Sequence, residues 1–255
     1  MRKVLLGATG LLGFAVVWQL IPMLGLVDPQ YLPYPTDVFA WLFQETRDLA
    51  FWRRLRLTMT SWVVGLAIAT LAAVVLGTAV GMVPFLRRAT HTMVEFLRPV
   101  PSVALIPLAV LMFGLQMRAA LVIIVYAAFW QVFVQVIYGV ADIDTVARDT
   151  ARSFGLTRRE RLRYLVLPTA LPYLMTGLRL AAAVALILAV TAEMVIGNPG
   201  LGRAIELSRS AGDAVGLYGL VVVTGILGLL VNVVFRFIER RSLAWHQSVR
   251  SEETR

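Results

Sequence analysis

Cysteine is absent from the sequence, which excludes disulfide bonds, thiolate nucleophiles and cysteine-ligated metals. Histidine is scarce: His91 and His246 lie far apart and both flank apolar segments, so we expect no metal site. Lysine occurs only at Lys3, whereas a phosphate-binding P-loop needs a lysine directly after its glycines. We therefore expect this chain to bind no cofactor. If ATP drives the protein, a partner chain must bind and hydrolyse it.

Apolar residues dominate what is present. They make up 59% of the 255 residues, and the mean hydropathy is +0.78, whereas soluble domains are roughly 45–50% apolar. The net charge of +9 comes almost wholly from arginines. These cluster at the ends of apolar runs, which indicates membrane topology rather than binding to nucleic acid. The sequence predicts an all-α membrane protein.

About six transmembrane helices are predicted, because a helix needs roughly 20 residues to cross a bilayer. The apolar segments are residues 4–26, 58–83, 102–115, 119–140, 171–196 and 217–238. The first is longer than the roughly 7–15 apolar residues of a signal peptide, so we expect it to be retained. After it, residues 31–36 are turn-like, and the aromatic residues that follow among charges predict helices lying in the membrane interface.

The third apolar segment is short for a bilayer and is interrupted by Pro107. Irregular backbone at membrane depth is tolerated only beside protein or water, so a broken segment is one candidate for lining a transport path. The alternative is a helix that begins before Pro99 and is merely kinked.

The basic residues predict the orientation. With both termini in the cytoplasm, the cytoplasmic segments hold 16 of the 24 basic residues, as the positive-inside rule requires. Four arginines between residues 47 and 56 then lie outside and favour the inverted topology. We expect residues 1–57 to form an N-terminal transmembrane anchor and outer interfacial loop, residues 58–241 the core, and residues 242–255 a cytoplasmic tail.

The connection from residue 142 to residue 168 has the pattern of two short helices joined by a bend outside the bilayer. Asp142 or Asp144 can cap the first helix. Gly155 is the residue best able to adopt the positive φ at its carbonyl end. The sequence thus predicts a helix that begins after one of these aspartates and a bend at Gly155.

A second short helix is predicted after this bend. Thr157 and Glu160 form a T-x-x-E capping box, the helix is expected over residues 158–166, and we expect Pro168 to end it. The small residues Ala151 and Gly155 would let a partner approach. A solvated loop that only sets topology explains the arginines equally well, but it does not explain the glycine and the proline.

The spacing of this loop resembles the EAA loop of ABC transporter permeases. The residues that carry the resemblance are Asp149, Thr150, Ala151, Gly155, Leu165, Leu167 and Pro168. Asp-Thr-Ala here replaces the Glu-Ala-Ala of the name. In that family the loop fits into a cleft on the ATP-hydrolysing subunit. The resemblance therefore implies an ATPase-coupling role for these residues and for the neighbouring Arg158 and Arg159.

Further segments resemble one permease subfamily, which serves importers of nitrate, sulfonate, taurine, bicarbonate and some vitamin precursors. They are residues 32–35, 97–108, 113–115, 171–172, 176–179, 192–194 and 200–202. The resemblance implies a type I importer fold in the bacterial inner membrane. It also implies three kinds of partner: a second permease subunit (usually an identical copy), a dimer of ATPase subunits, and an extracytoplasmic substrate-binding protein. A small anion such as sulfonate, taurine or nitrate, or a vitamin precursor, is the expected substrate.

Rows of small residues predict close helix packing in lipid. One row occupies positions 69, 73, 77 and 81, and a second occupies positions 177, 181, 185 and 189. The second row leads to Glu193 at the same spacing, so its face is expected to pack against another helix or to border the pathway.

Polar residues inside predicted spans are candidate pathway residues. Glu193 either lies at the pathway or sits near the outer interface, solvated or paired with an arginine such as Arg203. Gln131 and Gln135, one turn apart, could line a polar route or make helix-packing hydrogen bonds. Arg179 could bind an anion in transit or extend to the cytoplasmic headgroups.

Two other functions are weighed against a permease. A secondary transporter or channel would work without an ATPase and is expected to carry more intramembrane acids or an inverted repeat, neither of which is evident. A membrane-embedded enzyme needs a cluster of catalytic polar groups, and the sequence offers none. The pattern favours a permease subunit without catalysis of its own.

Overall fold

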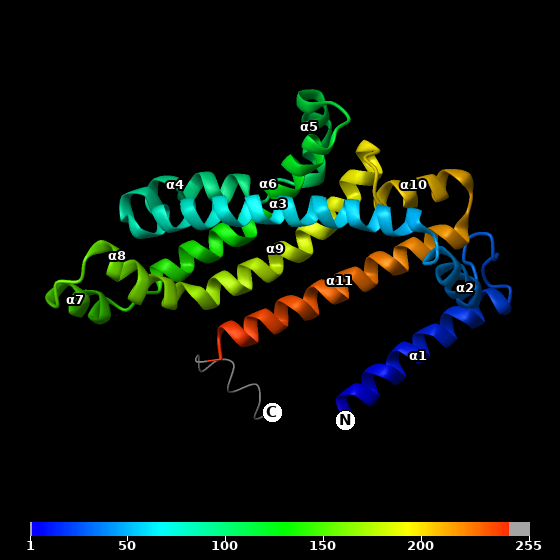
Figure 1. Cartoon of the computed structure of the whole chain (residues 1–255), viewed down its shortest axis with the longest axis horizontal. Coiled ribbons are helices and arrows are strands. Elements are labelled where there is room, and N and C mark those ends of the chain that lie inside the picture. Colours follow the sequence, from blue (N-terminus) through cyan, green and yellow to red (C-terminus); the bar gives the residue numbers. More distant parts are fainter. Residues whose placement is uncertain (1, 245–255) are drawn as a thin grey trace.

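Helices and short connections make up the described part of the chain. The computed structural model describes residues 2–244, among which no strand occurs (Figure 1). The elements are α1 (Arg2–Met23), α2 (Pro35–Glu45), α3 (Leu49–Met82), α4 (Pro84–Leu97), the 3₁₀ turn η1 (Ser102–Leu105), α5 (Ile106–Phe113), α6 (Met117–Ala141), α7 (Thr145–Ser153), α8 (Arg158–Arg161), the π-helical turn η2 (Leu162–Val166), α9 (Leu167–Ile196), α10 (Leu201–Ala211) and α11 (Ala214–Ser242). The predicted all-α class is confirmed.

Helices α3, α6 and α9 form the centre of the bundle, with α6 packed against both of the others. On α3, Ala69 and Ala73 are fully buried. A Cβ added at Gly77 would lie 3.0 Å from Cγ1 of Val136 on α6. Any side chain at this position would press on Val136, so the close packing predicted for the first row of small residues is confirmed.

The second row of small residues packs in the same way. On α9, the alanines at 181, 185 and 189 are fully buried. A Cβ at Gly177 would lie 3.1 Å from the carbonyl oxygen of Gln131 and 3.0 Å from Cβ of Gln135. This face of α9 therefore contacts α6. Packing against another helix was one of the two expectations for this face; bordering the pathway was the other.

Four helical stretches in the described residues are long and apolar enough to cross a membrane: α3, α6, α11 and the continuous stretch Arg158–Ile196. The pair formed by α4 and Ser102–Phe113 adds a fifth if it is taken as one span, although its halves are bent by 83°. A helix that begins before Pro99 was one of the two alternatives, and α4 is that helix. The bend between α4 and the residues after it is, however, far sharper than the kink that was expected. The apolar part of α1, Thr9–Met23, is shorter than a span. The number six therefore stays a prediction.

The first part of α3 differs from the prediction. Residues 49–57 were expected to lie in the interface, with the span beginning at about Thr58. In the structure α3 begins at Leu49, where the Asp48 side chain caps it by accepting from the Ala50 N–H at 2.9 Å. Phe51 is only 3% exposed because it packs in a second apolar cluster with Leu201 and Leu220. This tertiary contact, invisible in the local pattern, extends the helix.

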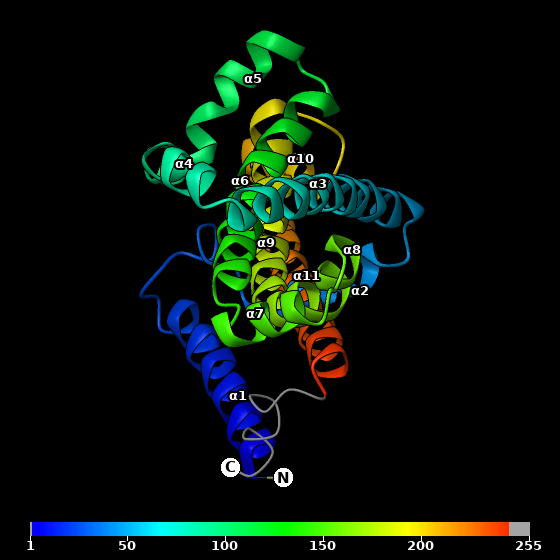
Figure 2. The ribbon, with the colours of Figure 1, turned by 90° about the vertical axis from the view of Figure 1, so that its left-hand side faces the viewer.

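Helix α1 stands apart from the bundle in both ribbon views (Figures 1 and 2). Its described contacts lie near its carbonyl end, where the Trp18 Nε1–H donates to the Pro33 carbonyl at 3.1 Å and the Trp18 ring lies 5.9 Å from that of Tyr218. The chain then turns into α2, with Pro35 at its start.

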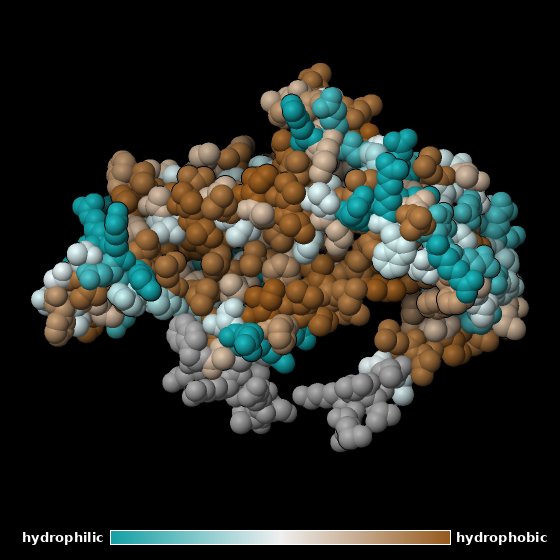
Figure 3. Space-filling model, viewed as in Figure 1, coloured by the Kyte–Doolittle hydropathy of each residue, from teal (hydrophilic) through white to brown (hydrophobic). Residues whose placement is uncertain are grey.

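The surface divides along the long axis of the molecule. Apolar residues cover the middle of the face seen in Figure 3, and hydrophilic residues gather at its two ends, over α7 and α8 on one side and over α2 and α10 on the other. Exposed apolar side chains on α3 and α11 contribute to the middle region. Such a band between polar ends is the surface of a multi-pass membrane protein.

Candidate functional site

The loop of residues 142–168 forms a helix-bend-helix at one end of the bundle (Figure 1). Of the two aspartates considered as caps, Asp144 caps α7: its side chain accepts a hydrogen bond from the Val146 N–H at 3.0 Å. Asp142 instead accepts a hydrogen bond of 2.7 Å from the hydroxyl of Tyr173 on α9. This second contact joins the start of the loop to the core.

The bend at Gly155 is a Schellman motif. Gly155 has φ of +71°. Its N–H donates to the Arg152 carbonyl at 2.9 Å, and the Leu156 N–H donates to the Ala151 carbonyl at 3.0 Å. These bonds satisfy carbonyl groups that a helix end leaves open. The predicted positive φ is confirmed.

The capping box at the start of α8 is also present. The Thr157 N–H donates to Oε2 of Glu160 at 2.8 Å, and the Glu160 N–H donates to Oγ1 of Thr157 at 3.3 Å. With both helices capped, the loop has a defined shape although most of it is exposed.

Pro168 does not end the second helix, contrary to expectation. α8 passes through η2 directly into α9, and Arg158–Ile196 is one continuous helical stretch. A proline inside a regular α-helix lacks its N–H and clashes with the carbonyl four residues earlier. Here the turn before Pro168 is π-helical, with the Leu167 N–H bonded to the Leu162 carbonyl. This wider turn accommodates the ring.

Apolar side chains surround a shallow cavity of about 440 Å³ on this loop. Its lining comprises Asp144, Val146, Ala147, Thr150, Ala151, Phe154, Leu156, Tyr164 and Leu165. Phe154 and Tyr164 are 81% and 65% exposed. Sequence reasoning missed both, although a large aromatic residue in a polar, arginine-rich loop was a signal for a contact surface.

The structure brings together only part of the predicted coupling set. Thr150, Ala151 and Leu165 line the cavity. Leu167 and Pro168 face a different hollow, shared with α3 and α6. The remaining members are exposed beside the cavity: Asp149, which pairs with Arg152 at 3.4 Å, Gly155, Arg158 and Arg159.

Glu193 lies at the opposite end of α9 and is only 1% exposed. Its Oε2 accepts from the Thr58 hydroxyl at 2.8 Å and from the Gly202 N–H at 3.0 Å. The Thr58 Oγ1 in turn accepts from the Leu201 N–H at 2.9 Å. The carboxylate therefore joins α3, α9 and α10. Of the alternatives considered for Glu193, the solvated position is wrong, because the residue is buried.

Arg203 is not the partner of Glu193 either. Its guanidinium donates to the Gly197 carbonyl at 2.6 Å. Two glycines instead make room for the acid: a Cβ at Gly200 would overlap the Glu193 carboxyl group, and one at Gly202 would overlap the Val190 carbonyl. Thr58 was missed in the sequence, where nothing distinguishes it from other threonines in helices.

The other candidate pathway residues lie in helix contacts. Gln131 and Gln135 are half-buried where α6 meets Gly177 of α9. Arg179 forms an ion pair of 3.1 Å with Glu239 near the end of α11. Two described helices thus hold the guanidinium that was expected to meet headgroups or an anion.

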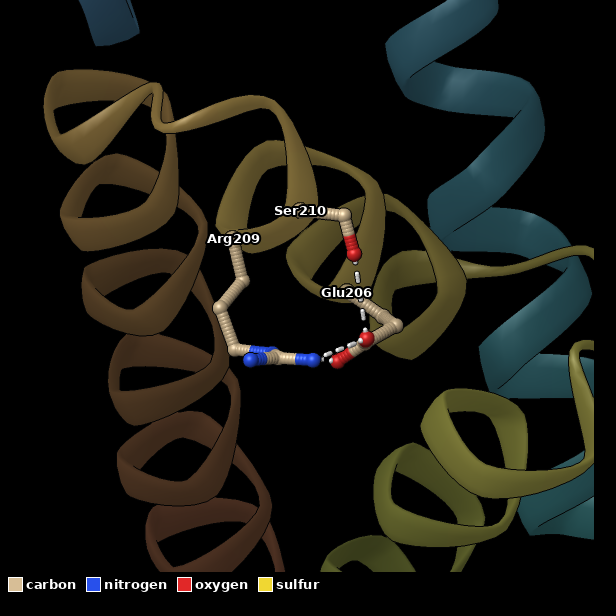
Figure 4. A network of polar contacts seen from close by, with 3 residues as sticks. All are labelled: Glu206, Arg209 and Ser210. Atoms are coloured by element: carbon tan, nitrogen blue, oxygen red, sulfur yellow. Dashed lines mark hydrogen bonds and ion pairs between the residues drawn. The ribbon is translucent and has the colours of Figure 1, made fainter.

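A separate polar cluster lies on α10, at the end of the molecule far from the loop of residues 142–168. Figure 4 shows Arg209 donating two hydrogen bonds to Glu206, of 2.8 and 2.6 Å, with Ser210 as a third donor at 3.2 Å. The hydrogen bonds from Arg209 hold the pKa of the Glu206 carboxyl below its ordinary value. In this bidentate pair Arg209 is exposed and Glu206 is half-buried.

Comparison with known proteins agrees with this arrangement. Residues 65–243 match a family described as binding-protein-dependent transport system inner membrane component. The chain is 31% identical over 255 residues to the taurine transport system permease protein TauC of Escherichia coli (strain K12), covering 97% of this chain and 92% of that protein. It is 26% identical to the putative aliphatic sulfonates transport permease protein SsuC of the same organism, covering 94% and 92%.

A solved structure shares the fold. One chain of the MetNI methionine ABC transporter in an inward-facing conformation matches with a TM-score of 0.63 and 21% identity, over 75% of this chain and 95% of that one. The family resemblance predicted from the sequence is confirmed.

Proposed function

Because the chain belongs to the family of binding-protein-dependent transport system inner membrane components and is the permease subunit of an ATP-driven importer, we propose that its loop of residues 142–168 is the surface that the ATPase subunit contacts. The observation that carries this proposal is the pair of exposed aromatic residues, Phe154 and Tyr164, beside a cavity on a fully capped helix-bend-helix. Exposed aromatic side chains next to a hollow are typical of protein interfaces.

The continuity of α8 with α9 supports a mechanical role. An ATPase that moves α8 acts on a helical stretch that continues to Ile196. The row formed by Gly177 and the alanines at 181, 185 and 189 leaves few interlocking side chains to resist a shift of α9. Movement of the loop is then transmitted along α9 to the far end of the bundle, and the ATPase subunit supplies the catalysis.

The substrate that we propose is a small anion such as a sulfonate, taurine or nitrate, or a vitamin precursor. The names of the relatives support the first two. The extracytoplasmic binding protein, which the family requires, would select the substrate. The permease would provide the route.

We propose that two identical copies form this route in the bacterial inner membrane, with both termini and the loop of residues 142–168 in the cytoplasm. Helix α5 projects from the bundle (Figures 1 and 2). Its side chains at Leu108, Leu111 and Met112 are 53%, 84% and 66% exposed. A second copy would cover this apolar surface. The arginines of the loop and of the end of α11 support the orientation.

Replacing Gly155 tests the coupling role. Gly155→Val places a β-branched residue at positive φ, which costs roughly 1–2 kcal/mol and distorts the bend. We expect ATPase activity stimulated by the binding protein, and solute uptake, to be lost. Gly212→Val is the matched control. Gly212 has the same φ of +71° and equally open surroundings, but it follows α10 at the opposite end.

The complex itself is identified first by purifying the tagged chain from its native membrane in mild detergent. A soluble subunit with a P-loop should accompany it in stoichiometric amounts. Stimulated ATPase activity in Gly155→Val equal to that of Gly212→Val would refute the coupling surface. A single purified chain that moves solute in liposomes without ATP would favour a secondary transporter or channel instead.

A further inference from the structure

Helix α4 turns all but one of its ionisable residues toward α6. A cleft of about 740 Å³ lies between the two helices. On the α4 side its lining comprises Arg87, Thr90, His91, Val94, Glu95 and Arg98. These positions follow the 3.6-residue helix repeat and form one stripe. The large side chains of Phe85, Met93 and Phe96 do not line the cleft and are 71%, 59% and 75% exposed.

This arrangement is that of a helix beside a polar route in a membrane. Ionisable side chains in membrane proteins face the bundle interior or a water-filled cavity, since contact with lipid is costly. In α4 the large apolar side chains are left for lipid or another chain, and Arg87 and the adjoining Arg98 line the cleft.

The far end of the cleft is held in place. The Tyr126 hydroxyl on α6 donates to the Leu97 carbonyl, the last residue of α4, at 2.7 Å. Arg98 follows directly, and after it the chain bends by 83° into η1 and α5. Broken backbone at membrane depth is tolerated beside protein or a cavity, and in transporters it commonly marks the binding site. Arg98 therefore stands where the irregular segment meets the cleft.

The positive charge of the cleft is not neutralised by the chain. In the described residues, neither the Arg87 nor the Arg98 side chain has a hydrogen bond or an ion pair. The one carboxylate in the lining, Glu95, is 3.4 Å from His91 instead. Two guanidinium groups are thus free to bind an anion. They are eleven residues apart, about 16 Å along the helix axis.

We propose that the α4–α6 cleft is a binding site for small oxyanions, sulfonates above all, on their way through the permease, with Arg98 as the ligand at the break and Arg87 as a separate basic contact farther along the cleft. The planar guanidinium group matches the oxygens of a sulfonate in a bidentate manner. The apolar side chains of Val134 and Ile137 beside them suit the short alkyl part of such a molecule. This inference rests on the proposed function, import of a small anion.

An anionic lipid offers the same oxyanion chemistry through its phosphate. Arg87 lies near the start of α4, at the end of the bundle that carries the loop of residues 142–168 (Figure 1). A headgroup at that level would reach Arg87. It would not reach Arg98, which is farther along the helix at the break. The position of Arg98 is therefore the reason for assigning the transported anion.

The test measures binding of ethanesulfonate to the permease–ATPase complex in phosphatidylcholine nanodiscs without binding protein, by ligand-observed NMR. Arg98→Gln should raise Kd about tenfold, the loss expected for one charge-assisted hydrogen bond, whereas Arg87→Gln, about 16 Å away along the helix, should change Kd much less. Arg88→Gln is the matched control, because Arg88 is on α4 but does not line the cleft. Propanamide, a neutral analogue, should not bind.

Equal affinity in Arg98→Gln and Arg88→Gln would overturn the site. So would binding of propanamide as strong as that of ethanesulfonate. Nanodiscs containing phosphatidylglycerol test whether the oxyanion in the cleft is instead the phosphate of an anionic lipid. If this lipid displaces ethanesulfonate, and native mass spectrometry finds it retained by the wild type but lost from Arg98→Gln, the cleft holds a lipid and the assignment fails. ATPase activity of the wild-type complex, stimulated by the binding protein, is measured in parallel. If that activity is present while the anion site fails, the proposed function as an importer still stands; if it is absent, the proposed function fails as well.

Discussion

The buried contact between Thr58 and Glu193 should be required for stable packing at the end of the bundle that carries α10. Thr58 is fully buried on α3. Its hydroxyl donates to Glu193 of α9 at 2.8 Å and accepts from the Leu201 N–H of α10 at 2.9 Å. Thr58→Val keeps the size and the branched shape of the side chain but removes both of these hydrogen bonds, together with the longer contact of 3.3 Å between the hydroxyl and the Arg54 carbonyl.

The size of the effect follows from what the substitution leaves unpaired. The Leu201 N–H loses its partner inside a buried region, and Glu193 keeps only the Gly202 N–H. A buried polar group without a partner costs about 1–3 kcal/mol. Two such losses predict that Thr58→Val lowers the free energy of unfolding by about 2–6 kcal/mol. Thr58→Ser retains the hydroxyl and should lose much less.

Reversible unfolding in mixed micelles measures this difference. Thr60→Val is the matched control: Thr60 lies on the same helix but is exposed, and its hydroxyl donates only to the Arg56 carbonyl at 2.8 Å. The reasoning fails if Thr58→Val unfolds at the same denaturant concentration as Thr60→Val. It fails equally if Thr58→Ser is as unstable as Thr58→Val, since the loss would then come from packing rather than from the hydroxyl.

Two further predictions concern ion pairs. A double-mutant cycle with Arg179→Gln and Glu239→Gln should give a coupling energy of about 0.5–1 kcal/mol, because the partly exposed pair is screened by solvent; unfolding measurements that give additive losses would contradict it. For Glu206 the carboxyl pKa is lowered by Arg209. The stability that this pair contributes is therefore present above the unfolded-state pKa and is lost as the pH falls through the lower folded-state pKa. Carboxyl-carbon NMR titration should show the Glu206 midpoint rising in Arg209→Gln, and an unchanged midpoint would refute the pairing.

Features that depend on a few neighbouring residues could be predicted from the sequence. The capping box of Thr157 and Glu160 and the positive φ of Gly155 are satisfied by hydrogen bonds within the loop itself. The rows of small residues were predictable for a related reason, since only a contact at close range requires such residues at every fourth position. In each case the determining interaction has a fixed spacing in the chain.

Features that depend on distant segments could not be predicted. Thr58 and Glu193 are 135 residues apart, and no local pattern identifies one as the partner of the other. The early start of α3 depends on Phe51 packing near α10 and α11. Pro168 was misjudged for a different reason. A proline usually ends a helix, and the sequence does not reveal that the preceding turn is π-helical.

The two ends of α9 carry the two most specific arrangements in the molecule, and this has a mechanical consequence. The π-helical turn and the loop of residues 142–168 precede the helix, and Glu193 lies three residues before its end. Thirty residues of α-helix span about 45 Å and hold their length through their internal hydrogen bonds. A displacement at α8 therefore reaches the Glu193 carboxylate as a movement of the whole helix. At that point the Gly202 N–H and the Thr58 hydroxyl bind the same oxygen atom, so α3 and α10 must follow α9 or give up these hydrogen bonds.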